Sequence, residues 1–275
     1  MDSLLDSFSA FGTMSKGLEA FFTLHGSKPV ARMAILDDDL AKVEAFCRRN
    51  GLALKLADFK VAMQFEGGYS TKGVMVDRKS SQKGHLFIYF SKEAGLAERA
   101  KVAEQMQAYN VFGMLLGYPE CCREFFVKHK PLEETFANDY VVPAIQNSKR
   151  RRFPFAMNIF GRYFDACLLS HAPCSLGCKP SLEIAQANFK LLQRQSPGVA
   201  HQLKGILTSA VIFGDEVILL PGRRSGKEFC FTSVLSTKKT ALAHMLEKAR
   251  RLAIIGQDHF QVGDSQYHLP LMEFN

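Results

Sequence analysis

Two short cysteine motifs constrain this chain more than any other feature, and each contains a proline that is expected to start a helix. The first motif reads GYPECC at residues 117–122, and the second reads HAPCSLGCKPS at residues 171–181. Proline is favoured in the first turn of a helix, so we expect Pro119 and Pro180 to begin helices. Both cysteine pairs then lie at helix N-termini, where free N–H groups and the helix dipole stabilise thiolates.

Cysteine usage elsewhere in the chain supports a site rather than a disulfide framework. The chain has 275 residues and seven cysteines, and its first ten residues lack the basic start of a secretory signal. We therefore predict a cytoplasmic protein with reduced thiols, in which clustered cysteines indicate metal or redox chemistry. Cys47, Cys167 and Cys230 lie in apolar segments and are predicted to be buried small hydrophobic residues.

The remaining four cysteines are predicted to form one centre: Cys121, Cys122, Cys174 and Cys178. Four thiolates suit either a structural zinc ion or an iron–sulfur cluster. Structural zinc sites usually have C-x2-4-C knuckles in both halves, whereas one half here is a vicinal pair. A cubane offers ligand positions on separate irons, so the spacing favours a [4Fe-4S] cluster. Zinc is the alternative, and a metal-free dithiol site is a third interpretation.

Charged and titratable residues beside the motifs are candidates for further roles. His171 and Glu120 are candidate catalytic acids or bases, although a turn histidine and a first-turn glutamate would also explain them. Lys179 and the basic run at residues 149–152, with Arg150 and Arg151, are candidate anion or cofactor contacts. The net charge of +8 favours acidic partners such as nucleotides, anionic metabolites or nucleic acid.

Hydrophobic periodicity predicts an α+β fold with three regions. Residues 1–92 read as a helical N-terminal stretch followed by a strand-helix-strand-strand unit, and residues 93–208 read as helices that carry the cysteine motifs. Within that middle region a single long helix is expected over residues 93–116. Residues 209–275 read as a C-terminal α+β unit, and one compact domain for the whole chain is the alternative.

Two other function classes find little support in the sequence. The segment GRRSGKE at residues 222–228 lacks the spacing and the Ser or Thr of a phosphate-binding P-loop, and it is predicted to be a basic hairpin turn. No run of eighteen or more apolar residues is present, so no membrane partner is expected.

The segments GYPECCREFF and HAPCSLGCKPSLEIA resemble the signature of an uncharacterised prokaryotic family, a domain of unknown function with GYPxCC and HxPCxxxC motifs. The resemblance covers roughly residues 110 to 190. It implies that the four motif cysteines and His171 belong together, and it implies no activity.

The sequence therefore predicts a metal-dependent protein, with an iron–sulfur enzyme as the leading interpretation. Such an enzyme would carry out redox or sulfur chemistry on a small anionic or nucleotide-like substrate. The alternative is a structural zinc protein that serves as a binding module, with RNA as a candidate ligand.

Overall fold

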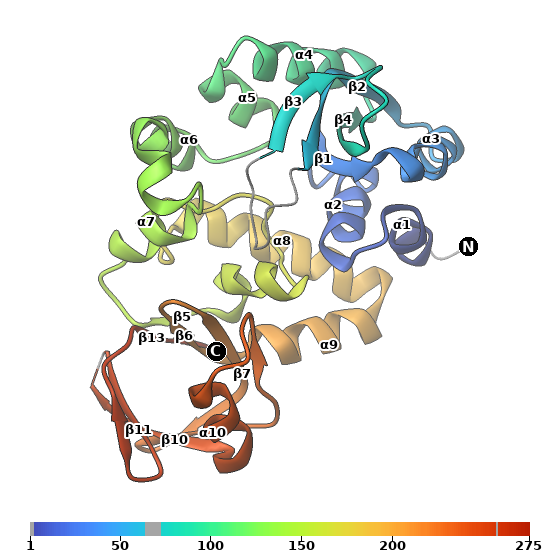
Figure 1. Cartoon of the computed structure of the whole chain (residues 1–275). Helices are drawn as coiled ribbons and strands as arrows, with labels where there is room; N and C mark the ends of the chain where they lie inside the picture. The colour runs from blue at the N-terminus through green and yellow to red at the C-terminus, as the bar shows by residue number, and fades with distance from the viewer. Residues whose placement is uncertain (1–2, 64–72, 257) are drawn as a thin grey trace. The chain divides into compact units, whose positions relative to one another are not determined.

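The computed structural model describes residues 3–63, 73–256 and 258–275, and it confirms a mixed α+β fold (Figure 1). The chain divides into two compact units, residues 1–127 and residues 128–275. Each unit has its own sheet and its own hydrophobic core. Within the described ranges, no helix combines the length and apolar character needed to cross a membrane.

The first unit is a four-stranded antiparallel sheet between helices. Its elements are α1 (Ser3–Phe11), α2 (Met14–Leu24), β1 (Ala31–Leu36), α3 (Leu40–Arg49), β2 (Ala53–Met63), β3 (Gly73–Asp77), β4 (Gly84–Ser91), α4 (Ala94–Gln105), α5 (Tyr109–Leu115) and the start of α6 (Glu120–His129). The strand order is β1-β4-β2-β3. The helical N-terminal stretch is present as the two helices α1 and α2, the three predicted strands are present as β1, β2 and β4, and β3 is an additional strand that the sequence pattern did not predict.

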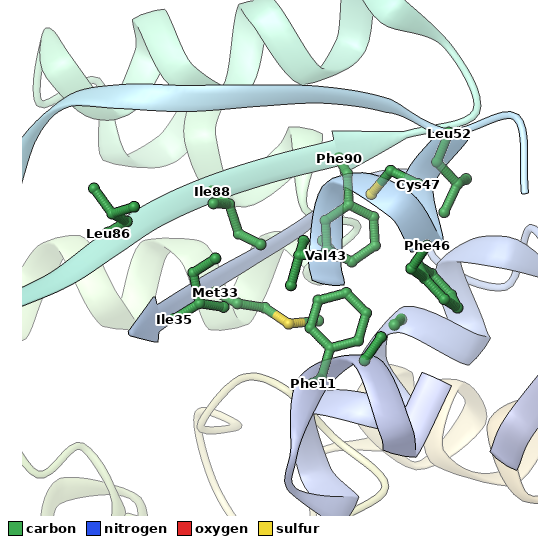
Figure 2. Packing of buried hydrophobic residues seen from close by; sticks show 13 residues of the cluster. Phe11, Met33, Ile35, Val43, Phe46, Cys47, Leu52, Leu86, Ile88 and Phe90 are labelled. Carbon is green, nitrogen blue, oxygen red and sulfur yellow. The ribbon is translucent and has the colours of Figure 1, made fainter. Parts of the chain in front are cut away.

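Alternation along β4 explains why helices cover both faces of this sheet. Leu86, Ile88 and Phe90 point to the face covered by α1, α2 and α3, whereas Tyr89 points to the face covered by α4 and α5. The ring of Phe11 packs against those of Phe46 and Phe90 (Figure 2), and its centroid lies 5.3 and 5.5 Å from theirs. These buried rings fix the helices against the sheet, because each Phe buries a large apolar area.

The single helix expected over residues 93–116 is wrong, because it is broken into α4 and α5. Gln107 adopts a left-handed backbone with φ of 53°, and the Ala108 N–H bonds back to the Ala103 carbonyl. This arrangement ends α4 and starts α5 in a new direction. The apolar spacing continues through the break, which is why periodicity alone did not reveal it.

The second unit begins with short helices and ends in a bent, largely antiparallel sheet. Its elements are the 3-10 helix η2 (Lys130–Phe136), α7 (Val141–Gln146), β5 (Arg152–Phe153), the 3-10 helices η3 (Phe155–Met157) and η4 (Ile159–Phe164), α8 (Lys179–Gln195), α9 (Pro197–Leu207), β6 (Ser209–Phe213), β7 (Val217–Ser225), β8 (Glu228–Phe231), β9 (Leu235–Ser236), α10 (Ala241–Ala249), β10 (Arg251–Gly256), β11 (His259–Val262), β12 (Ser265–Tyr267) and β13 (Leu271–Phe274). The order is β12-β11-β10-β8-β7-β6-β13-β5, with β9 beside β7 and only β5 parallel to its neighbour.

Strand β7 connects the two halves of this sheet. Residues 217–221 pair with β6 and residues 222–225 pair with β8. At Gly222 the β7 backbone approaches β8 so closely that an added Cβ would lie 2.1 Å from the Cys230 carbonyl oxygen. The predicted basic turn is confirmed as the two-residue hairpin connection Gly226–Lys227 between β7 and β8.

The three isolated cysteines divide differently from the prediction. Cys47 and Cys167 are buried as expected, but Cys230 is exposed. Its neighbours Phe229 and Phe231 point into the core beneath α10, so the alternation of β8 turns Cys230 outward. The apolar residues next to Cys230 in the sequence therefore lie on the buried face of the strand, and Cys230 lies on the other face.

Candidate metal centre

A glycine-terminated helix positions the first cysteine pair. The Gly117 N–H bonds to the Met114 carbonyl and the Tyr118 N–H bonds to the Gly113 carbonyl, which is the hydrogen-bond pattern of a Schellman motif ending α5. Gly117 has a φ of 78°, and a Cβ there would lie 2.9 Å from the Pro29 ring. Glycine is therefore required where the chain turns from α5 towards α6.

Helix α6 then starts immediately after Pro119. The Cys122 and Arg123 N–H groups both bond to the Pro119 carbonyl at 3.0 Å, so Cys121 and Cys122 lie in the first turn, as predicted. Adjacent residues on a helix normally point in different directions. Here the two sulfur atoms are nevertheless only 3.9 Å apart.

A compact turn positions the second pair at the start of α8. The Cys178 N–H bonds to the Ser175 carbonyl at 3.1 Å, and Cys178 is itself the N-cap residue of this seventeen-residue helix. Pro180 lies in the first turn, as the sequence predicts. A thiolate on the N-cap residue is stabilised by the positive end of the helix dipole.

The four predicted ligand residues come together. The sulfur atoms of Cys121, Cys122, Cys174 and Cys178 all lie within 4.8 Å of one another. Cys122 and Cys178 are buried, whereas Cys121 and Cys174 are half-buried. Four converging thiols with two half-buried members can bind a metal ion.

Two polar residues after α7 hold the second cysteine turn, and no sequence pattern indicates either of them. The Asn147 side-chain amide donates to the Cys174 carbonyl at 2.7 Å. The Ser148 hydroxyl accepts the Leu176 N–H at 2.8 Å and donates to the Ala144 carbonyl at 2.6 Å. Because Ser148 and Leu176 are buried, this hydroxyl fixes the turn between the two cysteines. No spacing rule connects residues so distant in sequence.

His171 lies outside the group of metal-ligand candidates among the described residues. It is buried, and its Nε2 atom lies 2.9 Å from the Ser181 hydroxyl in the first turn of α8. Its carbonyl accepts a hydrogen bond from Arg162 at 3.0 Å. These contacts anchor the loop that precedes Cys174, and a catalytic role for His171 stays a prediction.

The other predicted site residues are at the surface or in ion pairs. Glu120 and Lys179 are the exposed first residues of α6 and α8. Arg151 makes a two-pronged ion pair with Asp258, with N–O distances of 3.0 and 3.2 Å, and Arg150 is exposed. Roles for these residues in acid–base chemistry or anion binding stay predictions.

The centre consists of four closely packed thiols, of which three lie at helix N-termini and Cys174 lies in the turn before α8. An isolated thiol has a different environment: burial and the nearby Glu44 carboxylate raise the pKa of the Cys47 thiol to about 12.

Comparison of the chain with protein-family models, with curated proteins and with solved structures found no match. The site must therefore be interpreted from its own geometry.

Proposed function

We propose that this protein is a zinc-dependent binding protein whose four-cysteine centre holds one Zn²⁺ ion in a structural role. The observation that carries the proposal is the mutual distance of the sulfur atoms, all within 4.8 Å. With Zn–S bonds of about 2.3 Å, the sulfurs of a tetrahedral site lie about 3.8 Å apart. The separation of 3.9 Å between the Cys121 and Cys122 sulfurs is close to that edge length.

The same distances argue for a single ion over the [4Fe-4S] cluster that the spacing of the motifs favours. In a cubane each cysteine binds a different iron, so the ligating sulfurs lie outside a cluster that is wider than one ion. The four thiols would have to move apart to enclose such a cluster. To close on one ion, they need to move by only about 1 Å or less.

A set of four cysteine ligands suggests a structural role for the ion. Structural zinc sites are closed by four protein ligands, whereas catalytic sites keep one position for water or substrate. The burial of Cys122 and Cys178 and the hydrogen bonds from Asn147 and Ser148 support a rigid site. The binding free energy of the ion would then contribute directly to folding.

The competing proposal is an iron–sulfur enzyme acting on a small anionic substrate. The half-buried positions of Cys121 and Cys174 favour it, because a catalytic cluster must be reached by its substrate. The exposed Lys179 at the start of α8 would supply a positive charge next to Cys178. The resemblance of the motifs to an uncharacterised family is compatible with either proposal.

Metal analysis of the full-length protein, purified without oxygen, separates the two proposals. We expect about one equivalent of zinc, no acid-labile sulfide and no visible absorbance band. Iron with stoichiometric sulfide and a broad visible band would replace the zinc proposal with the cluster. A preparation with no bound metal after growth in zinc-supplemented medium would reject both.

Serine variants test the ligand set. Cys121→Ser and Cys178→Ser should each lose zinc and unfold at a lower temperature, because one thiolate ligand is removed. Cys230→Ser is the matched control, since Cys230 is exposed and lies outside the ligand group among the described residues. Normal folding with loss of metal in the Cys121 and Cys178 variants would indicate that the ion is not structural.

A further inference from the structure

The positive charge of the protein is concentrated in its second unit. Residues 128–275 contain 19 Lys and Arg against 12 Asp and Glu, which gives a net charge of +7. Residues 1–127 contain 16 Lys and Arg against 15 Asp and Glu, a net charge of +1. An asymmetry of this kind favours a polyanionic partner for the second unit.

Part of this charge is used inside the unit. Arg151 pairs with Asp258, and the carboxylate of Glu273 lies 3.1 Å from Arg152 and 2.6 Å from Arg224. These pairs connect the ends of β5, β7 and β13 with the β10–β11 hairpin. The arginines that remain for a partner must therefore be found on other faces.

Strand register places two such arginines in one row on the outer face of the sheet. Arg223 of β7 is opposite Cys230 of β8, and Cys230 is opposite Arg251 of β10. All three residues are exposed. Their neighbours Phe229 and Leu252 point to the opposite face, into the core that contains α10 residues. With strands about 4.8 Å apart, the two arginines are separated by about 10 Å at the backbone.

The positive charges of these two arginines are little neutralised by nearby carboxylates. Within the described part of the chain, no Asp or Glu oxygen lies within 4.0 Å of the Arg223 guanidinium. Arg251 has one partner, Glu228, at 3.9 Å, and both of these side chains are largely exposed. Exposed pairs of this kind contribute little, so the positive charge of Arg251 is available to a ligand.

The same outer face continues with imidazole rings and amides. Phe260 and Val262 of β11 point into the core, so His259 and Gln261 lie on the outer face. The His259 ring stacks on the His268 ring at a centroid distance of 4.1 Å and an interplanar angle of 21°. The His259 Nε2 atom also lies 3.3 Å from the Gln266 side-chain oxygen. Flat rings can stack on bases, and amides can hydrogen-bond to their edges.

We propose that this outer sheet face binds a single-stranded polynucleotide. On the outer sheet face, Cys230 lies in the row between the two arginines, and the proposed contact residues are Arg223, Arg251, His259, Gln261, Gln266 and His268. The two arginines would contact phosphates, whereas the rings and amides would contact bases, a combination typical of single-strand binding surfaces. The chemistry is shared by RNA and single-stranded DNA. The proposal does not depend on which metal the cysteine centre holds.

Fluorescence anisotropy with a labelled 20-nucleotide RNA of mixed sequence, and with the DNA of the same sequence, tests the proposal on the full-length protein. Affinity should fall linearly with salt on a log–log plot. The double variant Arg223→Glu/Arg251→Glu should bind at least about tenfold more weakly, with a salt slope shallower by about 1 to 1.5. The oligonucleotide that binds more tightly shows whether the face prefers RNA or single-stranded DNA.

The matched control reverses the same number of charges in the first unit. Arg78 and Lys79 are exposed on the turn between β3 and β4, and Arg78→Glu/Lys79→Glu should leave affinity unchanged. An equal loss of oligonucleotide affinity in both double variants would overturn the proposal, since it would show that binding depends only on the net charge of the protein. Binding to phosphatidylserine vesicles without binding to either oligonucleotide would also overturn it. Circular dichroism and metal content of each variant show whether folding and the cysteine centre are intact.

The exposed thiol in the arginine row supplies a direct footprint. Saturating oligonucleotide should slow alkylation of Cys230 by iodoacetamide several-fold, measured by peptide mass spectrometry. An unchanged alkylation rate at saturation would place the bound strand elsewhere and reject this face. Because Cys230 lies outside the metal-ligand group of the described residues, failure of this test leaves the zinc proposal unaffected.

Discussion

At the scale of single residues, the seven cysteines of this chain have three different environments. Four sulfurs converge within 4.8 Å, Cys47 and Cys167 are buried, and Cys230 is exposed. The sequence distinguished the clustered cysteines from the isolated ones because their spacing and neighbouring prolines are local features. It could not separate Cys230 from Cys47, because the direction of a strand side chain depends on which face is buried.

These environments predict different thiol reactivity. Burial and the Glu44 carboxylate raise the pKa of Cys47 to about 12, so its thiol stays protonated and unreactive at pH 8. Cys230 should be alkylated in the folded, metal-loaded protein, whereas Cys47 should react only after unfolding. Iodoacetamide labelling at pH 8, followed by peptide mass spectrometry with and without denaturant, measures both. Rapid labelling of Cys47 in the folded protein would contradict the buried position of its thiol.

At the scale of elements, both cysteine pairs depend on how a helix starts, and this much could be predicted from Pro119 and Pro180. The break between α4 and α5 could not, since the left-handed Gln107 interrupts the backbone without interrupting the apolar spacing. The hydrogen bonds from Asn147 and Ser148 to the second cysteine turn are also tertiary. Local signals therefore predict which cysteines come together, whereas the residues that hold them in place can be identified only from the fold.

Two glycines beside the cysteines should differ in their tolerance of a side chain. Gly117→Ala should lower the free energy of unfolding by about 1 to 3 kcal/mol, because φ is 78° and the new Cβ would lie 2.9 Å from Pro29. Gly177→Ala should change it by less than about 0.5 kcal/mol, since a Cβ there meets no atom within 4 Å. Urea unfolding of both variants measures the difference. Equal destabilisation would show that the turn before Cys178 also needs glycine.

At the scale of the whole molecule, two units with separate cores share one chain that carries a cysteine centre. The α+β class and most helices and strands could be predicted from periodicity, because each unit buries regular apolar faces. The choice between one ion and a cluster could not, since it depends on sulfur distances that no spacing fixes. Our zinc proposal therefore rests on the folded geometry and differs from the cluster that the motifs alone favour.

Removal of the zinc ion that we propose should lower the stability of the folded protein. A structural ion stabilises only the folded state, so chelation should lower the Tm by at least about 5 °C. Differential scanning calorimetry before and after chelation under reducing conditions measures the change, and added zinc should restore the original Tm. An unchanged Tm after complete metal loss, verified by elemental analysis, would argue against a structural ion.

The close approach of β7 to β8 at Gly222 has a consequence for the engineering of this protein. An epitope or reporter peptide inserted between Gly226 and Lys227 lengthens only a hairpin connection, and both strand ladders keep their pairing. One extra residue at Gly222 would shift the 222–225 segment by one position and exchange its inward and outward side chains. The hairpin tip is thus a permissive insertion point, whereas Gly222, four residues earlier on the same strand, is not.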